Sequence, residues 1–263
     1  MTPHDHAAPI SLLAPDEPPA VTIERANGAS AFVLLVDHAG NRLPRALGSL
    51  GLTDADLLRH IAWDIGALAT ARIMSSLLDA PMVAQTYSRL AIDCNRDPSW
   101  ESAMPEISEH TTIPGNIGVT AQQRAARRDA IFLPYHTAIR ALIDARNTRP
   151  TVLVAVHSFT PEYKSFRRPW HCGVLYNHNP ALALPLLELL RAEPGLEVGD
   201  NEPYSITDDS DYTIPEHGER RGLPHIELEI RQDLIEHNAG QRAWAERIAR
   251  LLPIACTKAG IAH

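Results

Sequence analysis

Two histidines stand directly after apolar runs that are typical of buried strands. Asp37 and His38 follow residues 31–36, and His157 follows residues 151–156. Neutral imidazole is the commonest protein ligand for metals, and sites gather beyond the carboxyl ends of parallel strands. The two histidines could therefore converge on one zinc ion. The alternative is a structural role, in which Asp37 caps a turn and each histidine bonds only nearby backbone.

A pair of glutamates marks the last predicted strand, residues 224–230. Glu227 and Glu229 are two residues apart, so both side chains point to one face, and Arg231 follows on that face. A carboxylate in a mostly buried strand needs a partner or has a raised pKa. We expect Glu229, which lies nearer the carboxyl end of the strand, to be functional. We expect Glu227 to be neutralised by Arg231 and Arg96.

A third polar cluster closes the segment 88–96. Arg89 and Arg96 are candidates to bind a carboxylate, because a guanidinium group forms paired hydrogen bonds to it. The alternative is that both arginines pair with protein carboxylates such as Asp93. For Arg89 the two interpretations stay open, whereas for Arg96 we favour a functional role.

Four further side chains could reach a site but have no assigned role. His60 and Asp64 are four residues apart within a predicted helix, a spacing that can hold a metal. The same spacing more often gives an ordinary contact on a helix face. His136 and His217 are titratable groups for which a structural role is the simpler interpretation.

The elements that must position these groups alternate along the chain. Apolar or alternating runs predict strands, and capping boxes followed by helical spacing predict helices. Strands alternating with helices are typical of a parallel sheet covered on both faces. We therefore expect an α/β fold: a single three-layer domain with a mixed, mainly parallel sheet. The predicted strands are residues 31–36, 82–87, 90–93, 151–156, 173–176, 196–198 and 224–230, and the predicted helices are residues 54–78, 120–147 (kinked or broken at Pro134), 181–191 and 239–252.

Three other segments are predicted to lack regular structure. Residues 95–119 and 200–223 are long, polar connections, and their length makes them candidates to cover a site. The start of the chain is polar and rich in proline, which predicts a flexible arm over residues 1–25. Residues 26–263 are then expected to form the single α/β domain.

Composition excludes several classes of function. The 263 residues carry a formal net charge of −8 and contain no long basic run, which argues against a nucleic-acid partner. No stretch approaches the roughly 20 apolar residues of a membrane span. The three cysteines, at positions 94, 172 and 256, have no zinc-type spacing and cannot all pair. This cysteine usage predicts a reducing, cytoplasmic location.

Eight sequence blocks together resemble the N-formylglutamate amidohydrolase family. They run in order along the chain as DHAGNRLP (37–44), HIAWDIGA (60–67), SRLAIDCNR (88–96), IPGN (113–116), PYH (134–136), HSFTP (157–161), NEPY (201–204) and EIRQD (229–233). That family is similar to zinc carboxypeptidases and aspartoacylase. In those enzymes an H-x-x-E and a later H-S hold zinc, a D-x-N-R binds substrate, and an E-L-R-D strand supplies the general base. The resemblance thus implies a zinc-carboxypeptidase-like (phosphorylase/hydrolase-like) fold.

The resemblance also implies a metal site with one Zn²⁺. His38 and His157 match the two zinc histidines. Asn41 stands where the related enzymes have the glutamate ligand, and an amide oxygen is a weak zinc ligand beside a carboxylate. Asp37 could supply the missing charge, so the expected ligands are His38, His157 and Asp37. Asn41 could bind the metal or the substrate.

The remaining roles implied by the resemblance concern the substrate. Glu229 matches the general base, and Arg96 with Asn95 matches the group that binds the substrate α-carboxylate. Arg89 or Arg231 is expected to stabilise the oxyanion. The expected partner is a small anionic N-acyl amino acid, best N-formyl-L-glutamate, which would be hydrolysed to L-glutamate and formate, a reaction of histidine catabolism. A homo-oligomer is possible.

Three other interpretations stay open. A related zinc acyl-amino-acid or peptide hydrolase would use the same chemistry on another substrate, because resemblance gives the reaction type more safely than the substrate. A binding protein that has lost its metal is conceivable because of Asn41. A metal-free hydrolase using Ser158 or Cys94 ranks last, since the sequence has no G-x-S-x-G motif.

Overall fold

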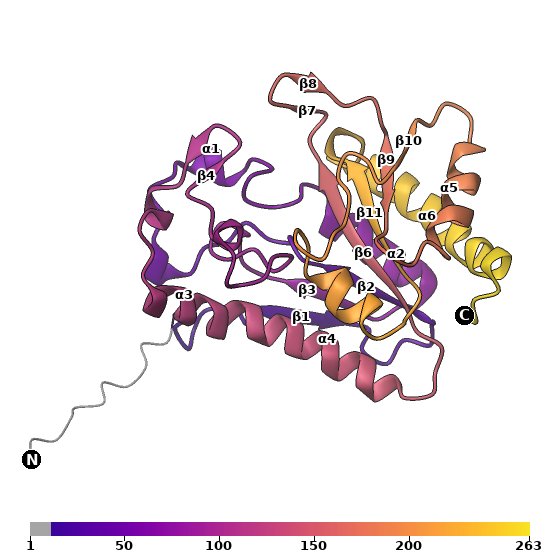
Figure 1. Ribbon diagram of the computed structural model, residues 1–263, viewed down its shortest axis with the longest axis horizontal. Coiled ribbons are helices and arrows are strands. Elements are labelled where there is room, and N and C mark those ends of the chain that lie inside the picture. The colour runs from indigo at the N-terminus through magenta and orange to yellow at the C-terminus, as the bar shows by residue number, and fades with distance from the viewer. Residues whose placement is uncertain (1–11) are drawn as a thin grey trace, which may run out of the picture.

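The centre of the protein is a seven-stranded sheet. The computed structural model describes residues 12–263, and it orders the strands β1-β3-β2-β6-β11-β9-β10 (Figure 1). Four neighbouring pairs are parallel, and only β1–β3 and β11–β9 are antiparallel. The predicted mixed, mainly parallel sheet is therefore confirmed. The strands are β1 Val21–Glu24, β2 Phe32–Val36, β3 Met82–Gln85, β6 Val152–Phe159, β9 Cys172–Leu175, β10 Val198–Asp200 and β11 His225–Arg231.

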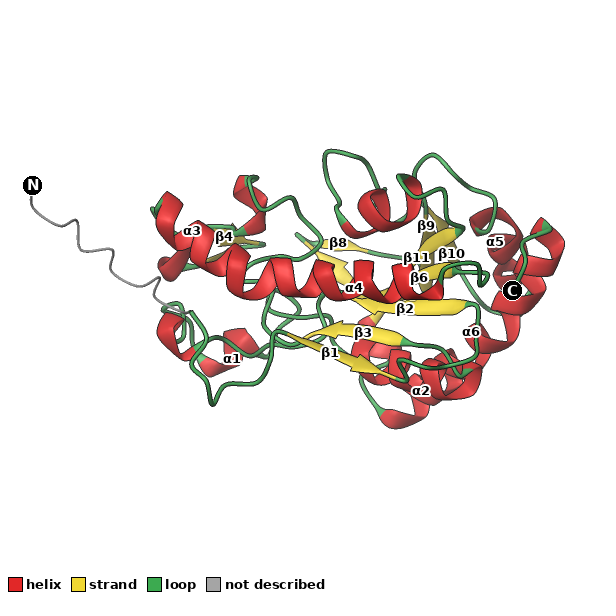
Figure 2. Cartoon of the chain, turned by 90° about the horizontal axis from the view of Figure 1, so that it is seen from below, coloured by secondary structure: helices red, strands yellow, loops and turns green. Residues whose placement is uncertain are grey.

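Helices cover both faces of this sheet, which confirms the three layers. One face carries α2 (Ala67–Leu78), α5 (Ala183–Arg191) and α6 (Asn238–Ala259); α2 and α5 contact the strands beneath them, and α6 contacts α2 and α5. The other face carries α4 (Leu133–Arg146), which contacts β1 and β3. Figure 2 shows α4 on one side of strands β1 to β3 and α2 with α6 on the opposite side.

The central strands send alternate side chains into two separate apolar clusters. In β6, Val154 and Val156 pack in the cluster that contains α2 and α6, whereas Leu153 and Ala155 pack in the cluster that contains α4. His157 follows on the same face as Leu153 and Ala155, because side chains alternate with a period of two. The α4 face of the sheet therefore changes from apolar to polar at the carboxyl ends of its parallel strands.

The predicted helix over residues 54–78 is wrong as one element. The chain forms α1 (Asp54–Leu57), which begins with the predicted capping box at Thr53, and then α2 only from residue 67. Gly66 has a φ of +81°, which ends any helical path, and the backbone N–H of Asp64 donates to the carbonyl of His38 (3.0 Å). This bond draws the segment between the two helices toward the end of β2.

The predicted helix over residues 120–147 is interrupted at the expected place. It comprises α3 (Ala121–Arg127), a π-helical turn (Arg128–Phe132) and α4, with Pro134 in the first turn of α4. Proline lacks the N–H that the preceding turn needs, and the wider π turn accommodates the lost bond.

Further differences concern short elements. Residues 90–93 form a turn, in which Ala91 N–H donates to Ser88 O, and not a strand. The segment 95–119 contains the short pair β4 (Ile107–Ser108) and β5 (Thr111–Thr112). Residues 21–24, which the sequence placed in the flexible arm, form β1 and pair with β3, whereas residues 1–11 lie outside the described residues. A small hairpin, β7 (Glu162–Tyr163) with β8 (Phe166–Arg167), follows β6.

Candidate metal centre and active site

A cavity of about 520 Å³ opens where the parallel strands β2, β6 and β11 end. Both polar segments that were predicted to cover a site, 95–119 and 200–223, contribute to its lining. Six side chains with predicted roles line the cavity: His38, Arg89, Asn95, Arg96, His157 and Glu229. The fold therefore brings together groups that are far apart in the sequence, as the strand-end argument predicted.

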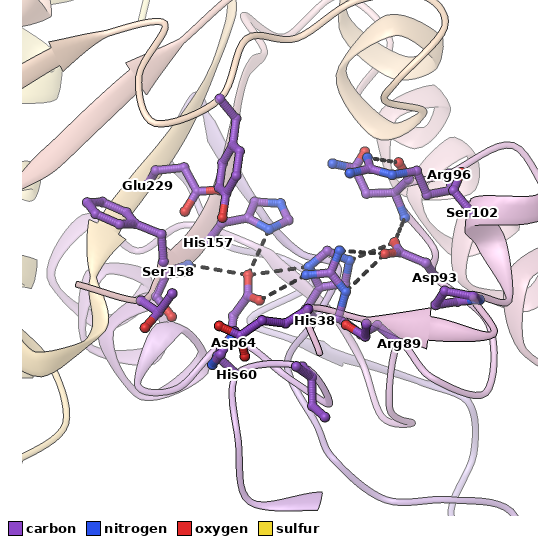
Figure 3. Close-up of a pocket in the computed structure, with 18 of the residues that line it drawn as sticks. His38, His60, Asp64, Arg89, Asp93, Arg96, Ser102, His157, Ser158 and Glu229 are labelled. Carbon is purple, nitrogen blue, oxygen red and sulfur yellow. Dashed lines mark hydrogen bonds and ion pairs between the residues drawn. The ribbon is translucent and has the colours of Figure 1, made fainter. Parts of the chain in front are cut away.

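Two histidines and one aspartate form a compact buried group in this cavity. His38 Nδ1 and His157 Nδ1 lie 3.3 Å and 2.9 Å from the same oxygen, Oδ2 of Asp64 (Figure 3). Ligands of a tetrahedral zinc ion at 2.0–2.1 Å would lie roughly 3.3 Å apart. Within residues 12–263, this is the one group of His, Cys, Asp or Glu side chains close enough to hold a metal ion. Its donor set fits zinc.

A second carboxylate contacts the other ring nitrogen, Nε2, of each histidine. His38 Nε2 donates to Asp93 Oδ1 at 2.7 Å, and His157 Nε2 donates to Asp37 Oδ2 at 2.9 Å. Both Nδ1 atoms donate to Asp64, and despite burial the surrounding carboxylates raise the pKa of His38 and His157, so without a cation both rings carry a proton on each nitrogen. A metal bound at Nδ1 would replace the Nδ1 protons, and the bonds to Asp93 and Asp37 would keep the protons on Nε2. Metal-binding histidines commonly have such a carboxylate partner, which fixes the ring and the tautomer.

Asp37 therefore lies outside the group that could hold a metal, contrary to the expectation that it is a ligand. Its Oδ1 accepts hydrogen bonds from the hydroxyls of Tyr135 (2.8 Å) and Thr213 (2.7 Å). Burial alone would raise the pKa of Asp37, but the hydrogen bond and charge of His157, the charge of His38 and the bond from Thr213 lower it to about 2. The carboxylate that completes the group is Asp64. The sequence singled out Asp64 with His60, but placed both in a helix that does not form there.

Two glutamates of β11 face the same cavity. In the sheet register Glu229 pairs with His157, and Glu227 pairs with Ala155. Burial raises the pKa of Glu227 and of Glu229 to about 8 each, and Oε2 of Glu229 has no hydrogen-bond partner among residues 12–263. A divalent cation would offset this surplus of buried carboxyl groups. The two glutamates therefore support a metal site at the histidine group.

The expected neutralisation of Glu227 by Arg231 and Arg96 is wrong. Arg231 donates to Asp233 Oδ1 (2.8 Å) and to a backbone carbonyl, and it does not line the cavity. The nearest polar contacts of Glu227 are Asn95 Nδ2 at 3.5 Å and His157 Nε2 at 3.8 Å. Glu227 thus belongs to the cavity and not to a surface ion pair.

The arginines of the 88–96 segment differ in their partners. Arg89 forms a two-pronged contact with Asp93 Oδ2 (3.0 Å and 2.6 Å), so its pairing with protein is confirmed although it also lines the cavity. Its NH1 lies 3.6 Å from Asp64 Oδ1. Arg96 uses NH1 to bind Asn95 O (2.8 Å) and Asp211 Oδ1 (3.0 Å). Its Nε and NH2 have no protein partner within residues 12–263.

Asn95 is held rigidly beside Arg96. Its side-chain oxygen accepts from the backbone N–H groups of Tyr212 (3.1 Å) and Thr213 (2.9 Å), and its Nδ2 donates to Asp211 (3.1 Å). Residues 211–213 therefore connect the Asn95–Arg96 pair to Asp37, which Thr213 contacts through its hydroxyl. Sequence reasoning gave no role to this short segment.

Several other candidates lie away from the metal group. Asn41 Nδ2 donates to Leu57 O at 2.9 Å and the residue does not line the cavity. His60 lines the cavity, with Nε2 at 3.5 Å from Glu109 Oε2. His136 and His217 bond each other at 2.9 Å, and burial lowers the pKa of His136 to about 4 and that of His217 to about 3. This pair has a structural position, as the sequence suggested.

The fold and the site define an α/β protein with a candidate metal centre at its strand ends. Residues 30–236 match the N-formylglutamate amidohydrolase family, so the chain belongs to this family and is an amide hydrolase by class. Family membership implies a small acyl-amino-acid substrate. Within the part of the chain that the structure describes, every helix is too short or too polar to cross a bilayer.

Two solved structures are similar over nearly their full length. Gene product Atu2144 from Agrobacterium tumefaciens is 36% identical, covers 94% of this chain and 98% of its own, and has a TM-score of 0.91. N-formylglutamate amidohydrolase from Ralstonia eutropha JMP134 is 20% identical, with coverages of 92% and 99% and a TM-score of 0.65. The second likeness shows the fold alone. No curated protein matches the sequence.

Proposed function

We propose that this protein is a zinc-dependent hydrolase of N-formyl or N-acyl amino acids, with N-formyl-L-glutamate as the best substrate and L-glutamate and formate as the products. The observation that carries the proposal is the His38–Asp64–His157 group facing Glu229 in one cavity of a family member. A small anionic N-acyl amino acid is the corresponding partner.

His38, Asp64 and His157 would hold one Zn²⁺, with Asp93 and Asp37 orienting the two histidines. A zinc ion bound there supplies a Lewis acid that polarises the amide carbonyl and lowers the pKa of water. Asp64 thereby takes the place that the sequence assigned to Asp37. Three protein ligands would match the number typical of catalytic zinc sites.

Glu229 acts as the general base. A cation held by His38, Asp64 and His157 would lower the raised pKa of Glu229 and favour its carboxylate form. This carboxylate removes a proton from the attacking water while the water oxygen bonds to the amide carbon, and it returns the proton to the nitrogen as the carbon–nitrogen bond breaks. Oε2 of Glu229 forms no hydrogen bond with any described residue, and Glu229 lies beside His157 in the sheet register. Both facts favour this role.

Arg96 and Asn95 bind the substrate α-carboxylate. Asp211 and the carbonyl of Asn95 hold Arg96 through NH1, so Nε and NH2 are available for a two-pronged contact. Arg89 takes the oxyanion role, because its NH1 points toward Asp64 while Asp93 holds its other nitrogens. Arg231 and Asn41 have no role in the reaction.

A related acyl-amino-acid hydrolase remains the second candidate. A cavity of about 520 Å³ lies in the range that accommodates drug-sized ligands, so N-acyl groups larger than formyl would fit. Rates on N-formyl and N-acetyl amino acids would separate the two candidates.

The three cysteines are free and buried, which agrees with a reducing, cytoplasmic location.

The deciding experiment measures hydrolysis of N-formylglutamate before metal removal, after dialysis against a chelator and after zinc is restored. We expect activity to be lost and regained, with one zinc per chain by metal analysis. Activity that survives in chelated, zinc-free protein would exclude the zinc mechanism. Absence of both zinc and activity would favour a metal-free binding protein.

A further inference from the structure

A buried arginine near the cavity has no ionic partner. Arg168 is only 6% exposed, and its guanidinium donates to Thr160 O (3.2 Å) and to the hydroxyl of Tyr204 (2.9 Å). Three aromatic rings surround it, with centroids at 5.6 Å (Phe159), 5.0 Å (Tyr163) and 4.8 Å (Tyr204). Among residues 12–263 no carboxylate forms an ion pair with it. Since charges are seldom buried without compensation, this arrangement calls for an anion.

The neighbours of Arg168 open onto the cavity. Phe159, Thr160, Tyr163 and Tyr204 all line it, and the first two directly follow Ser158 along the chain. In Figure 3 Ser158 and Glu229 lie on one side of the His–Asp–His group and Arg96 lies on the other. Arg96 and the segment that begins at Ser158 therefore approach the group from different sides.

Tyr204 can convey the charge of Arg168 into the cavity. An arginine only donates, so the Tyr204 oxygen accepts from Arg168 and the phenol proton is free for another acceptor. Although the residue as a whole is 44% exposed, desolvation and the charge of Glu229 raise the pKa of Tyr204 to about 12, so the hydroxyl stays protonated at neutral pH. A donor polarised by a neighbouring cation binds a carboxylate more strongly than a free phenol does.

We propose that Arg168 and Tyr204 form a second anion subsite, which binds a substrate carboxylate other than the one held by Arg96. The inference rests on the proposed hydrolase function and deepens it, because it makes the preferred substrates N-acyl amino acids with two carboxylates. The second carboxylate can belong to the amino-acid side chain, as in N-formylglutamate, or to the acyl group. Both present the same chemistry to Tyr204.

The main test compares two substrates that differ only in that charge. Zinc-loaded wild type and Arg168→Met are assayed with N-formylglutamate and N-formylglutamine; methionine keeps an apolar side chain among the three rings. We expect kcat/KM on N-formylglutamate to fall about 10- to 100-fold, mainly through KM, and that on N-formylglutamine to change less than about threefold. Arg167→Met, which removes the adjacent exposed arginine, is the matched control and should leave the substrate preference unchanged.

Equal losses on both substrates would overturn the proposal, because they would show that Arg168 acts through Glu229 or through the fold. An unchanged preference would overturn it as well. If Arg168→Met fails to fold, Tyr204→Phe decides the question, since it removes only one hydroxyl and should reduce the same preference. With both variants folded, the double substitution should lose little more than Arg168→Met alone, because both act on one carboxylate.

A second pair of substrates identifies where the carboxylate sits. If N-succinylalanine gains over N-butyrylalanine in an Arg168-dependent way, the subsite serves the acyl group; if only the N-formyl pair responds, it serves the side chain. If neither pair responds, no carboxylate binds there and the proposal fails.

Direct binding separates this inference from the proposed function. Calorimetry with L-glutamate and L-glutamine on the zinc-loaded protein measures the subsite without catalysis. Arg168-dependent selectivity for L-glutamate in a protein that hydrolyses none of the amides would keep the subsite and exclude the hydrolase. Hydrolysis of N-formylglutamate with no Arg168-dependent selectivity in either assay would do the reverse.

Discussion

The two faces of the central sheet are built from alternate residues of the same strands, yet they serve different purposes. Toward α2 and α6, the side chains of β6 and β11 are apolar and fully buried, as for Val154, Val156 and Leu228. Toward the cavity, the next residues in line are His157 and Glu229. Adjacent residues of one strand therefore face a packed core on one side of the sheet and a group of buried charges on the other.

Burial of side chains stabilises the fold on one face of the sheet and destabilises it on the other. Apolar burial on the face covered by α2 and α6 favours folding at roughly 25 cal/mol per Å². On the cavity face, burial of Glu227 and Glu229 disfavours their charged forms, as the raised pKa of each shows. A cation bound by the native state alone would offset part of that cost, so zinc should stabilise the fold as well as serve the reaction.

The largest expected effect lies on the cavity face. Glu229→Gln should lower kcat on N-formylglutamate by about 1,000-fold, because the amide cannot accept the proton of water. Zinc content and melting temperature should not fall, since Oε2 of Glu229 makes no hydrogen bond that would be lost. Glu227→Gln is the control two residues away, with a smaller expected loss. Near-normal turnover of zinc-loaded Glu229→Gln would remove this residue from the mechanism.

The adjacent residue should show the opposite behaviour. Leu228→Ala truncates a buried side chain on the face covered by α2 and α6 and should lower the free energy of unfolding by about 2–5 kcal/mol, measured by denaturant titration. For the folded fraction, kcat should stay within a few-fold of the wild-type value. A loss of turnover as large as that of Glu229→Gln in folded Leu228→Ala would contradict the separation of the two faces.

Substitution of a carboxylate that bonds a histidine Nε2 should have an intermediate effect, on zinc binding. Asp37→Asn replaces the carboxylate that holds His157 Nε2 and should weaken zinc binding by about 10- to 100-fold in competition with a chelator. If Asp37 were itself a ligand that no other group replaces, the loss would be far greater. Asp64→Asn, tested beside it, should show the larger loss of zinc.

The smallest effect is expected where sequence and structure disagree about a role. Arg231→Gln and Asn41→Ala remove side chains that do not line the cavity. Each should change kcat/KM by only about twofold, in line with the roughly 0.5 kcal/mol typical of substitutions away from special features. A fall of a hundredfold in either variant, with the fold intact, would return that residue to the site.

Much of the fold follows from local pattern. The runs before Asp37 and His157 are continuous and apolar, and the structure has buried strands at both places. The capping boxes at Thr53 and Thr120 begin helices as predicted. In contrast, β1 is four residues long and only partly buried, so the sequence carries no clear strand pattern there. Its strand is defined by the pairing with β3.

Less of the site follows in this way. Asp64 bonds histidines that are 26 and 93 residues away in the chain, and Arg168 packs against a tyrosine 36 residues further on. Neither contact leaves a periodic signal, although the blocks HIAWDIGA and NEPY contained Asp64 and Tyr204. Reasoning from spacing favoured Asp37 because it is the neighbour of His38 in the chain.

The amino-acid order by itself determined which strands are buried and that His38, His157 and Glu229 stand at their carboxyl ends, because strand periodicity and chain direction are local properties. Only the tertiary structure decided which carboxylate completes the metal group, which arginines are already paired and which cation is left without a partner. Those outcomes depend on where separate loops meet above the sheet, and that meeting is set by packing across the whole molecule.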